Sequence, residues 1–192
     1  MHDDVAQMLS GRWYLPNTPE LIALRDACGL LIDEFNALPA DRHRERERLL
    51  ARLFGACGRG VEVVPSLRCA YGFNVTVGDR VFINSGAFLM DDGPITIGDD
   101  VRIGPSAILA TPLHPIDDHR RRRAGYERTA PIVIADNCWL GSGVTVSAGV
   151  TIGRNTVVGA GSVVVRDLPD HVVAVGSPAA PIRELPAETA PD

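Results

Sequence analysis

Aliphatic residues recur at six-residue intervals through the second half of the chain. Each unit begins with Ile, Leu or Val, usually followed by Gly, and has a small or β-branched residue four positions later. The units begin at Val77, Ile83, Ile97, Ile103, Ile134, Leu140, Val146, Ile152 and Val158. Their fifth positions are Val81, Ala87, Val101, Ala107, Cys138, Val144, Val150, Thr156 and Ser162. Tandem hexapeptides predict a parallel β-helix, and the abundant Gly and Val argue against an α-helix.

The geometry of a triangular coil explains this period. Three six-residue faces complete one coil, and successive coils stack through ladders about 4.8 Å apart. Alternation along each short strand turns the aliphatic residue inward, and the small fifth residue fits a corner. Turns such as Gly98-Asp99-Asp100 supply the tight corner conformations. An ordinary antiparallel sheet has no reason to keep this period, so we expect a β-helix over residues 59–168.

A helical pattern precedes the repeats. Thr18-Pro19-Glu20 has the composition of a helix start and predicts a helix to about Asn36. A second helix is predicted from Asp41 to about Phe54, with the alternating Arg and Glu of residues 44–48 on a solvated face that carries intrahelical ion pairs. We expect residues 1–58 to cap the solenoid, because a terminal coil leaves backbone groups unpaired.

The period ends after Val165. The following segment, residues 169–192, is rich in proline, so a long helix or sheet is not expected there. The last residues, 187–192, are expected to be disordered.

One segment, residues 112–131, interrupts the repeats. It contains His114-Pro115-Ile116-Asp117-Asp118-His119 and then the run Arg120 to Arg123. A loop extruded at a corner leaves the coils intact and often carries function. The arginines could bind phosphates, but a solvated run balanced by Asp117, Asp118 and Glu127 is the simpler interpretation.

Composition narrows the classes of function. The net charge of −5 gives no support for nucleic-acid binding, and the apolar stretches are too short to span a membrane. The start Met1-His2-Asp3-Asp4 lacks the signature of a signal peptide, so a cytoplasmic protein is expected.

All 19 cationic side chains are arginine, which excludes catalysis that needs a lysine amine, such as Schiff-base formation. Cys28, Cys57, Cys69 and Cys138 lack metal-ligand spacing and are interpreted as reduced, mostly packed thiols, with no metal site.

Several ordered motifs resemble one known family. They are Tyr71-Gly72-Phe73-Asn74, Phe82-Ile83-Asn84, Asp91-Asp92, Thr111-Pro112-Leu113-His114-Pro115, Pro131-Ile132-Val133-Ile134, Trp139-Leu140-Gly141, Gly149-Val150-Thr151-Ile152-Gly153, Gly159-Ala160-Gly161-Ser162-Val163-Val164 and Gly176-Ser177-Pro178-Ala179. Together they resemble the hexapeptide-repeat sugar O-acetyltransferases, the group of maltose, galactoside and nodulation-factor acetyltransferases. The resemblance covers residues 8–183. It implies a left-handed parallel β-helix, a homotrimer, and acetyl-CoA as co-substrate in clefts between subunits.

The resemblance also implies roles for individual residues. His114 matches the family's general base, and an imidazole titrates close enough to neutrality for that task. On the acceptor side, Asn84, Asp92 and Tyr71 are implied to bind the small hydroxylated substrate. On the cofactor side, the implied CoA contacts are Ser142, Ala160, Arg166, Arg183 and Trp139. Arginines suit the CoA phosphates, and a backbone N–H near the thioester oxygen would stabilise the oxyanion.

The chain departs from the family pattern at several positions. Ala70 stands where relatives have Ser or Asp, and Leu15-Pro16-Asn17 lacks an acidic acceptor ligand. Val165 and Ala180 replace polar or basic residues that touch CoA in some relatives. Since the base is kept while hydroxyl-binding groups are lost, we expect the same chemistry on an altered acceptor.

Three other functions remain as alternatives. A related branch of the superfamily acetylates antibiotics, so N-acetylation or a xenobiotic acceptor stays open. A non-catalytic scaffold would keep the solenoid without the activity. A metal-dependent hydratase of the carbonic anhydrase type is disfavoured, because zinc needs three ligands and no histidine lies between His43 and His114.

Overall fold

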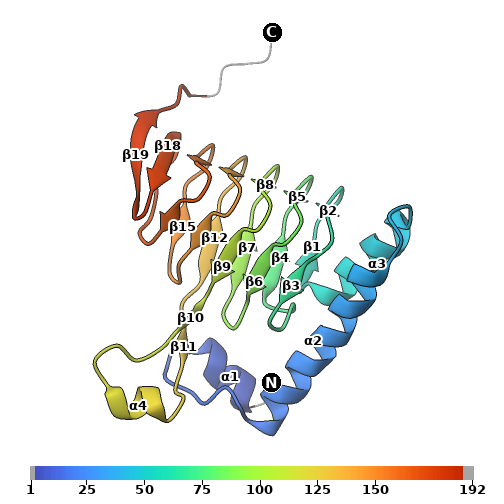
Figure 1. The fold of residues 1–192 in the computed structure, drawn as a ribbon, viewed down its shortest axis with the longest axis vertical. Helices are drawn as coiled ribbons and strands as arrows, with labels where there is room; N and C mark the ends of the chain where they lie inside the picture. The colour runs from blue at the N-terminus through green and yellow to red at the C-terminus, as the bar shows by residue number, and fades with distance from the viewer. Residues whose placement is uncertain (1–2, 188–192) are drawn as a thin grey trace.

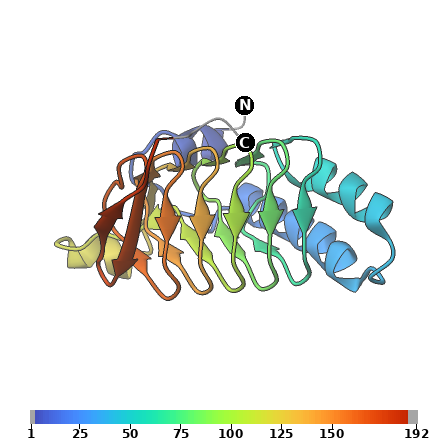
Figure 2. The ribbon, with the colours of Figure 1, turned by 90° about the horizontal axis from the view of Figure 1, so that it is seen from above.

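The computed structural model describes residues 3–187, and its core is a parallel β-helix with three sheets as the sides of a prism (Figures 1 and 2). Sheet 1 contains β1 (Ala56–Cys57), β4 (Val75–Val77), β7 (Ile95–Ile97), β12 (Ile132–Ile134) and β15 (Thr151–Ile152). Sheet 2 contains β2 (Glu62–Val63), β5 (Phe82–Ile83), β8 (Arg102–Ile103), β13 (Trp139–Leu140), β16 (Val157–Val158), β18 (Val172–Gly176) and β19 (Ala179–Glu184). Sheet 3 contains β3 (Arg68–Cys69), β6 (Phe88–Met90), β9 (Ile108–Ala110), β14 (Thr145–Val146) and β17 (Val163–Val164). The expected β-helix is confirmed, and its first strand begins at Ala56, three residues before the expected start.

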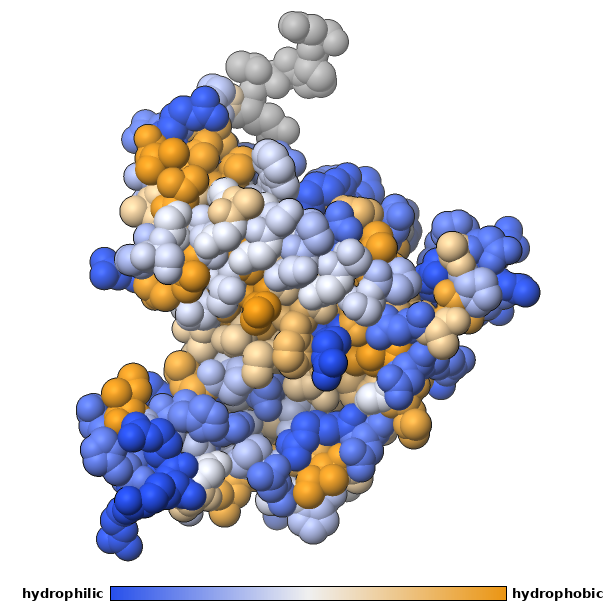
Figure 3. All heavy atoms as spheres, in the orientation of Figure 1, coloured by the Kyte–Doolittle hydropathy of each residue, from blue (hydrophilic) through white to orange (hydrophobic). Residues whose placement is uncertain are grey.

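The hexapeptide positions form the core as predicted. Every aliphatic residue that begins a unit, from Val77 to Val158, is at most 2 % exposed. The fifth positions are equally buried, from Val81 at 1 % to Ser162 at 1 %. The strongly hydrophilic surface lies over α4 and over the α2–α3 end of the molecule (Figure 3). The six-residue period therefore marks an inward aliphatic side chain at the end of each strand and a small buried residue at each corner.

Three corners connect the sheets, and we name them by the sheets that they join. The 1–2 corner contains residues 78–80, 98–100, 135–137, 153–155 and 169–171. The 2–3 corner contains residues 84–87, 104–107, 141–144 and 159–162. The 3–1 corner contains residues 70–74, 91–94, 111–131, 147–150 and 165–167. Residues far apart in sequence but at the same corner lie in one column, which decides which side chains can meet.

The N-terminal helices confirm the predicted pattern with small shifts in their ends. Helix α2 (Pro19–Ala37) begins after the N-cap Thr18, whose hydroxyl accepts a hydrogen bond from the N–H of Leu21. Helix α3 (His43–Leu53) follows, and both helices cover the coil that contains β1 and β3 (Figure 1). Asn36 of α2 fixes this packing, because its side chain bonds both the N–H and the C=O of Leu67 at 2.8 and 2.9 Å.

The charged face of α3 differs from the prediction. Arg42 and Glu45 form an ion pair at 3.3 Å, but Arg46 turns towards α2. Its guanidinium donates to the carbonyls of Leu38, Pro39 and Ala40 at 2.8 to 2.9 Å. These carbonyls follow the end of α2, so Arg46 closes the turn between the helices instead of belonging to a solvated face.

Helix α1 (Asp3–Leu9) does not cap the end of the solenoid. It lies beside the interrupting segment, where Thr129 donates from its hydroxyl to the carbonyl of Met8 at 2.9 Å (Figure 1). That segment contains β10 (Pro112–Leu113), α4 (His119–Arg123) and β11 (Arg128–Thr129), with β10 and β11 antiparallel. The predicted loop thus has its own hairpin and a short helix.

The C-terminal segment corrects one prediction. Residues after Val165 form a β-hairpin, in which β18 stacks on β16 and pairs antiparallel with β19. The prolines do not prevent it, because Pro178 lies in the turn and Pro181 lies on β19, the edge strand of sheet 2, where a missing N–H is tolerated. The expectation of disorder covers residues 187–192, which lie outside the described part of the chain except for Ala187.

Among residues 3–187, none of the helices combines the length and the apolar composition needed to cross a bilayer.

The buried thiol of Cys138, which is 1 % exposed, donates to the carbonyl of Gly153 at 3.0 Å, and burial raises its pKa to about 11. All four cysteines are free thiols in the structure.

Candidate active site

His114 faces a carboxylate that the sequence analysis did not identify as a site residue. The antiparallel pairing of Leu113 with Arg128 places the residues that flank these strands, His114 and Glu127, opposite one another. The His114 Nε2 lies 3.6 Å from Glu127 Oε1, and its Nδ1 lies 3.4 Å from the carbonyl of Tyr126. The imidazole is 58 % exposed while the Glu127 side chain is 17 % exposed. The pair therefore combines a reachable base with a partly desolvated acid.

Tyr14 holds Glu127 in position. The two residues exchange backbone hydrogen bonds at 2.8 and 2.9 Å, and the Tyr14 hydroxyl donates to Glu127 Oε2 at 3.3 Å. Burial, followed by the charges of Asp92 and Glu127, raises the pKa of Tyr14 well above its ordinary value. Tyr14 thus remains a neutral donor. The sequence signal that could have found Glu127 was a carboxylate in the same corner segment as His114.

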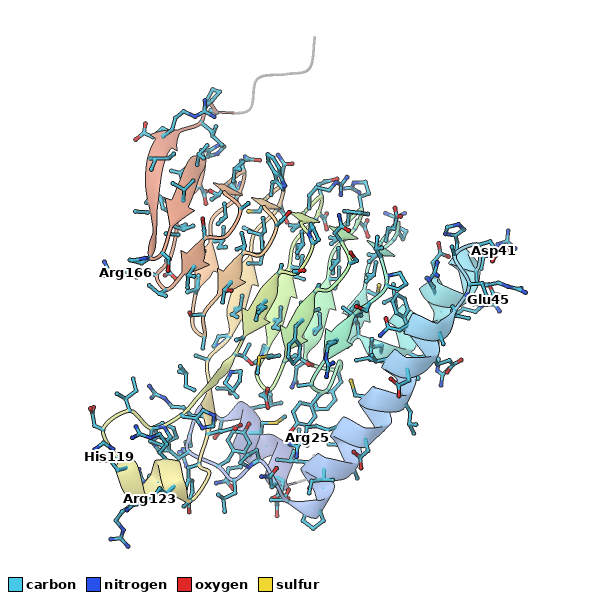
Figure 4. All side chains as sticks on the ribbon, in the orientation of Figure 1. Arg25, Asp41, Glu45, His119, Arg123 and Arg166 are labelled. Atoms are coloured by element: carbon cyan, nitrogen blue, oxygen red, sulfur yellow. The ribbon has the colours of Figure 1, made fainter. Side chains whose placement is uncertain are left out.

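Tyr71, a predicted acceptor ligand, is tied to Arg25 of α2. Arg25 donates to the Tyr71 hydroxyl at 2.8 Å, to the Pro16 carbonyl at 2.8 Å and to the Asn17 Oδ1 at 3.0 Å. Figure 4 shows Arg25 on the side of α2 that faces α1 and the solenoid. Tyr71 is 3 % exposed, and burial raises its pKa to about 12 although Arg25 opposes this. Arg25 is a second residue that the sequence analysis missed.

Two adjacent aspartates complete this side of the site. Asp91 is fully buried and is structural, because it accepts the N–H groups of Ala70 and Tyr71 at 2.9 and 2.8 Å. Asp92 is 8 % exposed, and burial, with the nearby charges of Glu127 and Asp91, raises its pKa to about 6. Together with burial, the charges of Asp92 and Glu127 raise the pKa values of both Tyr14 and Tyr71, so the two carboxylates belong to one cluster, which Glu127 connects to His114.

The other predicted contacts occupy a different corner of the same chain. Asn84, Ser142 and Ala160 all lie in the 2–3 corner, and backbone hydrogen bonds stack this column from coil to coil. The Asn84 Oδ1 accepts from the N–H of Ser85 at 2.8 Å, so its amide group is oriented by its own turn. His114, Asp92 and Tyr71 lie in the 3–1 corner. Within one chain, the predicted general base His114 therefore lies at a different corner from Ser142 and Ala160, the predicted contacts of the thioester and pantetheine.

The remaining predicted cofactor residues are distributed around sheet 2 and the C-terminal hairpin. Trp139 projects from β13 and is 57 % exposed, and Arg183 pairs with Val173 in the β18–β19 ladder. Arg166 lies in the 3–1 corner and projects beside the hairpin (Figure 4). Both arginines are exposed and make no side-chain hydrogen bond or ion pair with another described residue. Their guanidinium groups remain available to anionic groups.

Two other histidines make hydrogen-bond contacts outside the proposed site. His119, at the start of α4, accepts a hydrogen bond on Nδ1 from Arg122 at 2.9 Å. His171 lies beside Asn155 in the 1–2 corner. Within residues 3–187, no three His, Cys, Asp or Glu side chains gather as a metal-binding group.

Comparison with known proteins identifies relatives over the whole fold. Residues 7–58 match the maltose acetyltransferase hexapeptide capping motif, and residues 131–166 match the bacterial transferase hexapeptide model with six repeats. The galactoside O-acetyltransferase of Escherichia coli (strain K12) is 39% identical over 155 residues, which cover 81% of this chain and 76% of that protein.

Solved structures agree with these matches. A maltose O-acetyltransferase from Clostridium difficile 630 has a TM-score of 0.94 and 39% identity, covering 97% of this chain and 99% of that one. A hexapeptide-repeat acetyltransferase from Vibrio cholerae O1 biovar eltor, solved with acetyl coenzyme A, has a TM-score of 0.89 and 39% identity, covering 97% of this chain and 100% of that one.

Proposed function

Because the chain belongs to the maltose and galactoside O-acetyltransferase family of hexapeptide-repeat acetyltransferases, we propose that it transfers an acetyl group from acetyl-CoA to a hydroxyl of a sugar or similar small molecule. His114 is the general base of this reaction. The observation that carries the assignment is the His114–Glu127 pair, which sets a reachable imidazole against a carboxylate beside a cluster of hydroxyl-binding groups.

The chemistry proceeds by direct transfer. His114 removes the hydroxyl proton as the acceptor oxygen attacks the thioester carbon, and Glu127 stabilises the imidazolium that forms. The tetrahedral intermediate then collapses with cleavage of the C–S bond. The proton passes from His114 to the departing CoA thiolate, which restores the neutral base and leaves free CoA and the acetylated acceptor.

The acceptor is bound by the cluster around Asp92. Its carboxylate accepts hydrogen bonds from sugar hydroxyls, while Arg25 and Tyr71 form a polar wall behind it. Asn84 orients the acceptor from the opposite side of the cleft. Ala70 leaves a hydroxyl-binding position empty, and this supports an acceptor other than galactoside or maltose.

The cofactor lies between two chains of a homotrimer. Ser142 and Ala160 supply backbone groups to the thioester and pantetheine, Trp139 lines the cleft, and Arg166 and Arg183 bind CoA phosphates. Since one chain places Ser142 and His114 in different corners, the proposal needs the 2–3 corner of one subunit to face the 3–1 corner of its neighbour. A cyclic trimer provides such head-to-tail contacts.

The test is a thiol-release assay with acetyl-CoA, corrected for hydrolysis, across sugars, aminoglycosides and other hydroxylated acceptors. With the acceptor found, His114→Ala is expected to lower kcat by about 10²–10⁴-fold, the usual contribution of a general base. Its affinity for CoA, measured by calorimetry, should match that of the unchanged protein. Turnover like that of the unchanged protein would contradict the role of His114. A protein that binds no CoA would favour the scaffold alternative.

A further inference from the structure

Helix α4 gives the interrupting segment a positive charge that is unusual for this chain. Residues 112–131 contain five arginines against three carboxylates, while the whole chain carries a net charge of −5. The helix buries no side chain, so hydrophobic packing does not explain the arginine run. The hydrophilic surface over α4 is one of the most extensive on the face shown in Figure 3.

Two of the four consecutive arginines have structural partners. Arg121 pairs with Asp118 at 3.6 Å, and Asp118 also caps the helix by accepting the N–H of Arg121 at 2.9 Å. Arg122 donates to the carbonyls of Pro115 and Ile116 at 3.1 and 2.7 Å. These two arginines therefore hold the loop together.

The other two arginines have no such role. Arg120 and Arg123 make no side-chain hydrogen bond and no ion pair with any residue in the described part of the chain. Arg123 projects from α4 away from the solenoid (Figure 4). Asp118, whose pKa is lowered first by its bond to the Arg121 N–H and also by the charges of Arg121 and Arg120, is the nearby counter-charge. One carboxylate cannot neutralise the four guanidinium groups of α4, so the helix keeps an excess positive charge.

A cavity joins this charge to the site. A cavity of about 330 Å³ is lined by Arg120 and Arg121 together with Asp118, Ala124 and Tyr126, so two guanidinium groups face one carboxylate there. Tyr126 connects α4 to the proposed base: its N–H donates to the Arg121 carbonyl at 3.1 Å, and its carbonyl lies 3.4 Å from His114 Nδ1. Tyr126 thus borders the arginine-lined cavity and also contacts the proposed base.

We propose that Arg120, supported by Arg121 and Arg123, binds an anionic group of the acceptor, so that the substrate is a hydroxylated small molecule carrying a phosphate or carboxylate. This inference rests on the proposed function and names its substrate class. Guanidinium groups bind both anions with charge-assisted hydrogen bonds, and the cavity is large enough for such a group but not for a macromolecule.

The experiment compares matched neutral and anionic acceptors on the protein saturated with CoA, so that the phosphate sites of CoA are filled. Calorimetry on the CoA-saturated protein measures the binding of glucose, glucose 6-phosphate and glucuronic acid. Turnover with each is measured separately, by thiol release from acetyl-CoA without added CoA. At least one anionic acceptor is expected to bind about tenfold more tightly than glucose, the worth of one charge-assisted hydrogen bond. This preference should shrink as salt rises from about 0.01 to about 0.15 M, because the Debye length shortens from about 30 to about 8 Å.

Variants identify the residues responsible. Arg120→Gln with Arg123→Gln should remove the anionic preference and leave glucose and CoA binding unchanged, whereas Arg44→Gln, an exposed arginine of α3, should change neither. The inference is overturned if no anionic acceptor is preferred, if none of the three binds, or if the double variant loses CoA affinity. The proposed function fails separately, when acceptors bind with the expected preference but no acetyl group is transferred.

Discussion

Asp92 shows how one residue of the site carries a cost to stability. Its carboxylate is almost fully buried beside Glu127 and Asp91, and its pKa is raised to about 6. In the unfolded chain the same group titrates near 3.8. The folded state therefore favours the protonated form, and the penalty for ionisation is absent below pH 4 and complete above pH 6.

This predicts a pH-dependent effect of Asp92→Asn. The substitution removes a penalty of about 3 kcal/mol that follows from a shift of about two pKa units. The thermal midpoint of the variant should therefore exceed that of the unchanged protein by an amount that grows between about pH 4 and pH 6, as calorimetry at several pH values would measure. Asp26→Asn on the exposed face of α2 is the control. A difference that does not change with pH would contradict the assignment.

Glu127 is expected to act on catalysis and not on cofactor binding. Glu127→Gln keeps the shape of the residue and its acceptor oxygen for Tyr14 but removes the charge that faces His114. We expect kcat to fall by about 10- to 100-fold, since hydrogen bonds to charged groups contribute about 1.5–3 kcal/mol. The KM for acetyl-CoA should stay the same.

Steady-state kinetics across pH measures the Glu127 effect. Glu62→Gln, on the exposed face of β2, provides the matched control for loss of one carboxylate. An unchanged kcat with an unchanged pH profile would remove Glu127 from the mechanism.

At the scale of the strand and its turn, the 1–2 corner explains why the repeats contain both Gly and Asp. The N–H of Asp79 donates to Asp99 Oδ1 at 2.8 Å, and the N–H of Asp99 donates to Asp136 Oδ1 at 2.9 Å. Each carboxylate thus bonds the preceding coil. The carboxylates of Asp99 and Asp136 can come this close because Gly78 and Gly98 have no Cβ. A Cβ at Gly78 would overlap Asp99 Oδ1, and a Cβ at Gly98 would overlap Asp136 Oδ1.

Gly98→Ala is therefore expected to destabilise the protein by about 1–3 kcal/mol, the usual cost of overpacking. Gly29→Ala is the control with the same chemical change: a Cβ at Gly29 of α2 would meet no atom within 4 Å, and the lower entropy of the unfolded chain should stabilise by about 0.5–1 kcal/mol. Chemical denaturation of both variants measures the two effects. If Gly98→Ala and Gly29→Ala changed the free energy of unfolding equally, close packing at Gly98 would not explain its place in the corner.

At the scale of the whole molecule, the six-residue period was enough to predict the β-helix, because the same pattern of inward aliphatic and small corner residues is repeated in every coil. The hairpin after Val165 escaped prediction, since an edge strand accepts the prolines that a central strand would not. Glu127 and Arg25 also escaped, because only the path of the loop and of α2 brings them to His114 and Tyr71. The left hand of the coil came from the resemblance alone and not from the period.

The proposed trimer can be tested by mixing two inactive variants. His114→Ala and Asn84→Ala should each be inactive alone, and subunits exchanged by unfolding and refolding together should recover activity. If each site takes His114 from one chain and Asn84 from its neighbour, equal mixing restores about one quarter of the sites in a cyclic assembly. Light scattering of the mixed sample checks that trimers have formed. No recovery in mixed trimers would place both residues in a site within one chain.

The backbone exchange between Tyr14 and Glu127 joins residues 113 positions apart in the sequence. It makes the segment around Tyr14 a wall of the site and not a detachable cover. A shortened protein that begins at the hexapeptides would keep the solenoid coils but would lose the partner of Glu127. The N-terminal segment and the His114 loop are thus expected to change together during evolution, so exchanging this segment between relatives should alter acceptor choice before it alters the fold.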